Sequence, residues 1–442
     1  MRDELSAVEL KAIIWHLLEV CPECAQAAEE SWVLALDGVA EPACERLVAF
    51  EGPAVGELSF ERVRRRVHST LSRLEAERAH ARELARELDG LPVEHLCMQL
   101  RNNPRFASLP LCDLLLEKAW ELGLVEPKAG LMQIEALIEL SSSIEASLFG
   151  HELRHELLSR AWAYRGNFLR ILNDFRLAEA AFAQSELHLN AGTGDLLEKA
   201  RFLSLKASLR RSQRRLDEAN DLLQRSVAIY LGTDEDHLAG RAMISQAGVA
   251  FEQGNPAKSA NLVKHALTLI DPAREPRLVL VSQQNLVLDL TEMGLYQEAV
   301  AMLPKTRRLS IEYGSRFDLL RFRWLEGSIL QGLGHDARAE AAFLEVRKGF
   351  LEEELGYDAA LVSLNLASLY ARQGRIPELK RLTLEMVPIF ESREVHREAL
   401  TALLLFQKAV EMETVTVRMV EEVATYLRRS QHEPRLRFEE PS

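Results

Sequence analysis

The sequence repeats itself with a period of 40 or 41 residues over more than half of its length. A mostly small residue recurs six times, at successive steps of 41, 40, 40, 40 and 40 residues. These anchor positions are Gly166, Ala207, Ala247, Val287, Gly327 and Ala367. Self-similarity at such a period is typical of helical solenoids, in which one unit cannot bury its apolar face alone. The repeat therefore predicts a stack of similar units.

Each unit carries the same three further features after its anchor position. Seven residues on, a turn is predicted at Asn173, Arg214, Gly254, Gly294, Gly334 and Gly374. Five residues later come Ala178, Ala219, Ser259, Ala299, Ala339 and Leu379. Four residues later again come Phe182, Leu223, Val263, Leu303, Phe343 and the polar Thr383. Glycine favours the left-handed conformation that ends a helix, and residues four apart share a helical face. Each unit is therefore predicted to be helix, turn, helix.

This pattern resembles the tetratricopeptide repeat. The segment AWAYRGNFLRILNDFRLAEAAFAQS matches the aromatic, glycine, turn, alanine and phenylalanine positions of that repeat, and QQNLVLDLTEMGLYQEAV and LNLASLYARQGRIPEL match its first helix and turn. The usual unit has about 34 residues, so these longer units are similar to those of kinesin light chains and bacterial peptide-sensing regulators. The resemblance implies an all-α protein, a right-handed α-solenoid of antiparallel helix pairs that together form a superhelix.

The segments around the repeats suggest further divisions of the chain. We expect a small helical N-terminal module, an amphipathic connecting helix, a degenerate leading repeat, six repeats, capping helices and a disordered tail. Their expected ranges are 1–50, 57–90, 91–150, 151–395, 396–430 and 431–442 respectively.

Two short motifs raise the question of zinc. His16, Cys21 and Cys24 resemble the zinc-binding motif of anti-sigma factors, but the His–Cys spacing is one residue too long, and no His or Cys upstream offers a fourth ligand, which leaves Cys44 as the one candidate. We therefore expect a remnant that holds a small helical module. His151-Glu152-Leu153-Arg154-His155 matches the His-Glu-x-x-His pattern of zinc metalloproteases, without a third ligand at a recognised spacing. No metal, cofactor or catalytic residue is assigned from these motifs.

The first helices of the units are expected to line the concave wall, where a partner would bind. Six residues before the anchor positions lie Arg160, Arg201, Arg241 and Arg321, and nearby offsets carry Asn167, Asn285 and Asn365. Asparagine can donate to and accept from a peptide backbone, and arginine can bind carboxylates through two parallel hydrogen bonds. These seven residues form the predicted site for an extended peptide, and the arginines favour an acidic one. The alternative is that the arginines pair with glutamates of neighbouring helices.

Composition narrows the classes of partner. The net charge of −13 disfavours a general nucleic-acid-binding surface, and no run of about 18 apolar residues predicts a membrane span. Five cysteines, an odd number confined to the first quarter of the chain, favour a reducing cytoplasm. We expect a non-enzymatic cytoplasmic scaffold that binds a protein or peptide. The alternatives are a regulator whose N-terminal module binds a sigma factor, and a metalloprotease at His151–His155.

Overall fold

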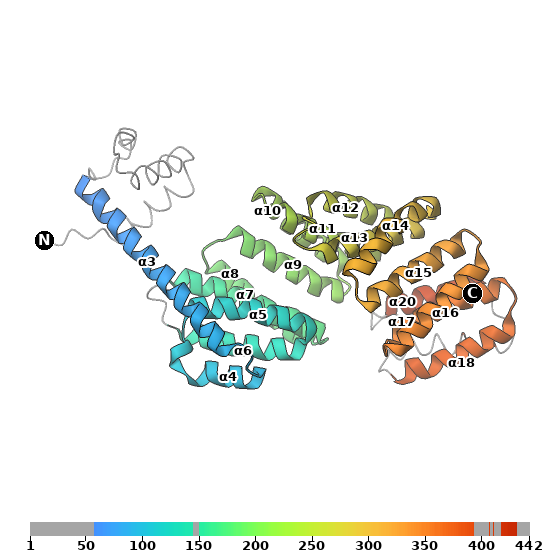
Figure 1. Ribbon diagram of the computed structural model, residues 1–442, viewed down its shortest axis with the longest axis horizontal. Helices are drawn as coiled ribbons and strands as arrows, with labels where there is room; N and C mark the ends of the chain where they lie inside the picture. The colour runs from blue at the N-terminus through green and yellow to red at the C-terminus, as the bar shows by residue number, and fades with distance from the viewer. Residues whose placement is uncertain (1–56, 145–149, 393–405, 407–409, 411–416, 431–442) are drawn as a thin grey trace. The chain divides into compact units, whose positions relative to one another are not determined.

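A computed structural model describes residues 57–144, 150–392, 406, 410 and 417–430 of the chain (Figure 1). The proposed N-terminal module with His16, Cys21 and Cys24 lies outside the described residues, and so do the tail 431–442 and, apart from 406 and 410, residues 396–416 of the expected capping segment 396–430. The sigma-factor alternative therefore concerns residues that the structure does not describe.

The chain divides into two compact units, Met1–Glu87 and Leu88–Ser442. In the first unit the described residues belong to one long helix, α3 (Glu57–Leu88), which covers the amphipathic segment noted in the sequence. The second unit begins with α4 (Val93–Asn102), the short 3₁₀ helix η3 (Pro104–Phe106), α5 (Leu109–Val125) and α6 (Pro127–Ser143). No strand occurs in the residues that the structure describes, as expected for an all-α chain.

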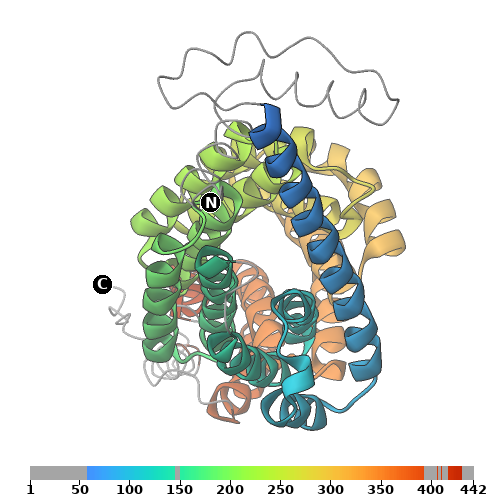
Figure 2. The same ribbon diagram turned by 90° about the vertical axis from the view of Figure 1, so that its left-hand side faces the viewer.

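Six helix pairs follow, in chain order, and each pair corresponds to one sequence repeat (Figures 1 and 2). The first helices are α7 (Gly150–Ile171), α9 (Leu196–Ser212), α11 (Asp236–Glu252), α13 (Pro276–Glu292), α15 (Arg316–Gly332) and α17 (Gly356–Arg372). The second helices are α8 (Phe175–Asn190), α10 (Leu216–Gly232), α12 (Pro256–Leu269), α14 (Tyr296–Tyr313), α16 (Asp336–Glu352) and α18 (Ile376–Ser392). A last described helix, α20 (Val417–Ser430), packs on α17.

The repeat positions read from the sequence are equivalent in space. All six anchor residues are buried, including Val287, the one large residue among them. All six turn residues have positive φ, between 61° at Arg214 and 78° at Gly334. Leu379 and Thr383, which depart from the repeat pattern, are buried in the same way as their counterparts in other repeats. The sixth unit therefore tolerates these substitutions without losing its packing.

Contacts between pairs show which helices lie on the inner side of the stack. Each first helix contacts the first helix of the next pair, whereas no comparable contact joins successive second helices in the described part of the chain. Helices that stay close to one another must lie on the inside of a curve, while those that spread apart lie on its outside. The first helices therefore form the inner face of the solenoid.

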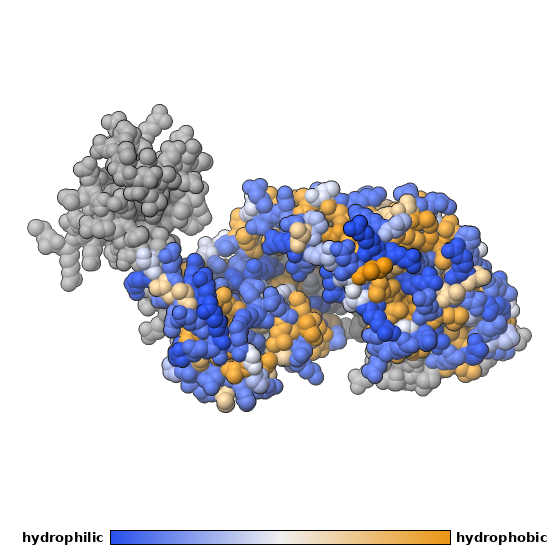
Figure 3. All heavy atoms as spheres, viewed as in Figure 1, coloured by the Kyte–Doolittle hydropathy of each residue, from blue (hydrophilic) through white to orange (hydrophobic). Residues whose placement is uncertain are grey.

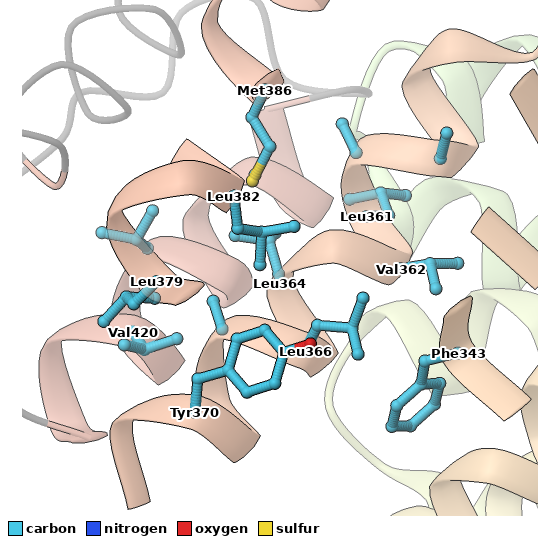
Figure 4. Close-up of a cluster of buried hydrophobic side chains, with 14 of the residues drawn as sticks. Phe343, Leu361, Val362, Leu364, Leu366, Tyr370, Leu379, Leu382, Met386 and Val420 are labelled. Carbon is cyan, nitrogen blue, oxygen red and sulfur yellow. The ribbon is translucent and has the colours of Figure 1, made fainter. Parts of the chain in front are cut away.

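The core is continuous from one helix pair to the next. At its C-terminal end, α16, α17, α18 and α20 enclose Phe343, Leu364, Leu366, Tyr370 and Val420 (Figure 4). The side chains of Leu379, Leu382 and Met386 come from one face of α18 and point into the same cluster (Figure 4). Burial of such apolar area is the main stabilising contribution to a helical stack. None of the helices described is both long and apolar enough to cross a bilayer.

Candidate binding site on the first helices

All seven residues of the predicted peptide site lie on first helices. Arg160 and Asn167 belong to α7, Arg201 to α9, Arg241 to α11, Asn285 to α13, Arg321 to α15 and Asn365 to α17. The offsets of six and two residues before the anchor, and one residue after it, follow the spacing of one helical face. The structure brings some of these residues together and gives others different partners.

Arg160 and Arg201 share a network of carboxylates. Glu198 of α9, whose side chain is only 7% exposed, lies 2.7 Å from Arg160 Nη2 and 3.0 Å from Arg201 Nη1. Arg160 also pairs with Asp113 and Glu117 of α5, at 2.7 Å and 3.3 Å. Burial opposes the charge of Arg160, but Glu198 and Asp113 outweigh it, so the pKa of Arg160 is raised. These contacts join three successive helix pairs, as the alternative of ion pairing between helices predicts.

Arg241 is the most exposed of the four arginines in the predicted site. Its side chain is 51% exposed, and its guanidinium forms an ion pair with Glu275 at 3.6 Å. A pair this long and this solvated contributes little to stability. The guanidinium of Arg241 is therefore accessible from the inner face.

Asn285 and Arg321 are brought into direct contact. Arg321 Nη2 donates to Asn285 Oδ1 at 2.8 Å, and burial lowers the pKa of Arg321. Asn365, which lies two repeats after Asn285 in the sequence, accepts a similar hydrogen bond. Its Oδ1 accepts from Trp324 Nε1 at 3.1 Å. Both amide oxygens are thus occupied by a neighbouring repeat. The Nδ2 groups of Asn285 and Asn365 donate to no other group among the described residues, so each half-buried amide presents a donor.

Asn167 is buried, and its side chain holds an arginine, Arg170, that is not among the seven predicted site residues. Arg170 donates to Asn167 Oδ1 from Nε at 3.1 Å and from Nη2 at 3.0 Å. Arg170 lies four residues after the anchor Gly166, and Arg211 lies four residues after the anchor Ala207. The recurrence of arginine at this offset was a signal in the sequence that could have identified Arg170 and Arg211 as further candidate residues.

The His-Glu-x-x-His segment forms the start of α7, and its second histidine faces another helix. His155 Nδ1 lies 2.8 Å from Nδ1 of His188 in α8, so one ring nitrogen donates to the other. Burial lowers the pKa of His188, and the nearby His155 and Arg154 act in the same direction. Across the described ranges, no three His, Cys, Asp or Glu side chains are arranged to hold a metal ion. The geometry of this segment is that of a contact between paired helices.

On the face shown in Figure 3, hydrophilic side chains surround several separate hydrophobic patches over the helical repeats. The candidate site therefore rests on the polar residues at fixed offsets on the first helices.

Comparison with known proteins identifies the fold. No protein-family model matches the chain, and no curated protein matches its sequence. A Rap protein crystallised with competence and sporulation factor is similar over 73% of this chain and 88% of its own, at 13% identity and a TM-score of 0.56. Aspartyl phosphate phosphatase F from Bacillus subtilis aligns over 89% of this chain and 96% of its own, at 12% identity and a TM-score of 0.48. Kinesin light chain TPR-like repeats from Podospora anserina align over 45% of this chain and 97% of their own, at 16% identity and a TM-score of 0.38.

The first of these likenesses is strong enough to establish the architecture but not an activity. It agrees with the helix pairs, the buried anchors and the left-handed turns described above. The chain has the fold of the tetratricopeptide-like helical repeat proteins.

Proposed function

We propose that this chain is a non-catalytic scaffold that binds an extended segment of a protein or peptide along its first helices. The observation that carries this proposal is the pair of oriented amides at Asn285 and Asn365. Each uses its oxygen to accept a hydrogen bond from the next or preceding first helix, which fixes the amide and leaves its nitrogen to donate. A fixed donor is suited to a backbone carbonyl of an extended chain, because little side-chain freedom is lost on binding.

The solved Rap structure supports the same mode of action by analogy. That protein was crystallised with competence and sporulation factor, so a related fold accommodates a partner. Arg241 and Arg321 would add positive charge to the inner face of a chain whose net charge is −13. An acidic partner is therefore favoured over a basic one. We place the protein in the cytoplasm on the basis of its cysteine content, and the free, buried Cys97 and Cys112 are consistent with this assignment.

The proposal is tested by removing the two donors without removing the acceptors. The full chain is used to capture partners from an extract of its source, and the captured partner is then titrated against variants. Asn285→Asp with Asn365→Asp keeps an oxygen for Arg321 and Trp324 but replaces each donating nitrogen. We expect the double variant to bind the partner at least about tenfold more weakly, as the loss of two hydrogen bonds predicts.

Asn190→Asp with Asn261→Asp, at exposed positions of the second helices α8 and α12, is the matched control for the change in charge. It should bind like the unaltered chain. Equal affinities for the double variant and the control would contradict binding through these amides.

A further inference from the structure

Arg170 is a cation on the first helix α7 that forms no ion pair with any other described residue. It lies half-buried on α7, and none of the ion pairs within the described residues involves it. Its three hydrogen bonds go to neutral oxygens: two to Asn167 Oδ1, and one from Nη1 to Ser212 Oγ of α9 at 3.3 Å. Burying a charge is unfavourable unless an opposite charge compensates it. Most inner-face arginines have such a partner, as Arg160 does in the network with Glu198.

The hydrogen-bond geometry of Arg170 leaves two donors for a ligand. A guanidinium has five N–H groups, one on Nε and two on each terminal nitrogen. Asn167 takes one from Nε and one from Nη2, and Ser212 takes one from Nη1. One N–H on each terminal nitrogen remains. Two donors on adjacent nitrogens match the two oxygens of a single carboxylate.

A second arginine increases the positive charge at this place. Arg211 occupies the equivalent position on the next first helix and pairs with Glu252 at 2.6 Å. Burial lowers the pKa of Arg170, and the proximity of Arg211 adds to that effect. Glu252 also pairs with Arg214 at 2.6 Å, so its single negative charge is shared, and the pair of Arg170 and Arg211 retains a net positive charge.

The next repeat leaves room for Arg211. A Cβ built on Gly248 of α11 would lie 3.0 Å from both terminal nitrogens of the Arg211 guanidinium. Gly248 lies one residue after its anchor, at the offset that Asn167 occupies in the first repeat. The absence of a side chain there allows the guanidinium of Arg211 to lie against the helix.

We propose that Arg170, supported by Arg211, binds one carboxylate group of a peptide partner. Asn167 and Ser212 are positioning residues that hold the guanidinium, and the carboxylate accepts the two remaining N–H groups. This inference rests on the proposed binding function and names the chemistry of one part of that site. The carboxylate belongs either to an Asp or Glu side chain or to the C-terminus of the peptide.

Synthetic peptides test the proposal with the full chain at low ionic strength. The probes are fluorescein-labelled hexaglutamate with a C-terminal amide, hexaglutamine with a free C-terminus, and hexaglutamine with a C-terminal amide. Fluorescence anisotropy is measured for the unaltered chain and for Arg170→Gln, Arg170→Lys and Arg176→Gln. Arg176 is exposed on the second helix α8 of the same repeat, so its replacement is the matched control for net charge.

We expect a carboxylate-bearing probe to bind the unaltered chain and the Arg176 control equally. Arg170→Gln should weaken that binding about tenfold or more, and Arg170→Lys should fall between them because it keeps the charge but not the paired donors. The first two probes distinguish a side-chain from a terminal carboxylate. Thermal unfolding of each variant confirms that the fold is retained.

Three results would overturn the inference: equal binding of acidic probes by Arg170→Gln and the unaltered chain, equal binding of all three probes, or no binding of either carboxylate probe. These outcomes are distinct from failure of the proposed function, which is judged by partner capture with the Asn285 and Asn365 variant. A partner whose affinity depends on the two amides but not on Arg170 would leave the scaffold function standing and remove the carboxylate site.

Discussion

The ring of Phe182 fills the space that a side chain at Gly166 would need. A Cβ built on Gly166 would lie 2.8 Å from Phe182 Cδ2, and one built on Gly327 would lie 2.7 Å from Phe343 Cε1. In both repeats the phenylalanine follows the glycine by 16 residues. Where the anchor is Ala207 instead, the residue at that spacing is the smaller Leu223. In these three repeats the smallest anchor, glycine, is paired with the largest residue, phenylalanine, on the second helix.

Replacing Gly166 with alanine is expected to destabilise the fold. The added methyl group overlaps the Phe182 ring, and overpacking of this kind costs about 1 to 3 kcal/mol. Urea denaturation followed by circular dichroism measures the change. Gly232→Ala is the matched control, because Gly232 is exposed at the end of α10 with no atom near its missing Cβ. The control should be unchanged or slightly more stable, and an equal loss in both variants would contradict the close contact.

Asp289 is expected to make stability depend on pH. Its side chain is 1% exposed and accepts a hydrogen bond from Ser259 Oγ at 2.8 Å. Burial raises the pKa of Asp289 from 3.8 to about 7, although the hydrogen bond from Ser259 opposes the shift. Between these values the folded state holds a proton that the unfolded state has lost. The contribution of Asp289 to the free energy of unfolding is therefore greatest below pH 3.8. It declines as the pH rises to about 7 and stays constant above that pH.

Asp289→Asn removes this titration. The free energy of unfolding of the variant relative to the unaltered chain should rise between pH 4.5 and pH 8, by up to about 3 kcal/mol. Chemical denaturation at a series of pH values measures the difference. Asp221→Asn, at an exposed position of α10, should show no such trend. A difference that is independent of pH at position 289 would contradict the raised pKa.

Loss of the Glu198 carboxylate is expected to weaken the joint between repeats. Glu198→Gln leaves Arg160, which is only 14% exposed, with its charge less well compensated. Removing one partner of a buried ion pair costs about 3 kcal/mol, which thermal or urea unfolding would detect. Glu186→Gln breaks an ion pair with Lys206 in which the glutamate is 50% exposed, so its effect should stay below about 1 kcal/mol. Similar losses in the two variants would show that Glu198 has no special role.

The repeat architecture could be predicted from the sequence because backbone geometry fixes its spacing. The turn between paired helices needs a residue with positive φ at one position, and the period identifies that position even where the residue is not glycine. Asn173 and Arg214 adopt φ of 63° and 61° there. The anchors were predictable for a related reason, since only residues of limited size fit where two helices cross.

The partners of the inner-face arginines could not be predicted in the same way. Glu198 contacts Arg160 from the neighbouring helix α9, nine residues before the anchor of that helix, whereas its contact with Arg201 lies within α9 itself. Whether such side chains meet depends on the angle between successive helix pairs, which the sequence period does not determine. The contact of Asn167 with Arg170 was local, at a spacing of three residues, and in principle could have been predicted from helical geometry.

Site-specific photo-crosslinking tests most directly whether the first helices bind the partner. A p-benzoylphenylalanine is placed at Arg241, which is 51% exposed on the inner face, or at Lys264, which is exposed on the second helix of the same repeat. Each full-length protein is irradiated with the captured partner, and the crosslinked species is analysed by mass spectrometry. We predict that the partner is crosslinked from position 241 and not from position 264. Crosslinking from position 264 alone, or equally from both positions, would contradict binding at the inner face.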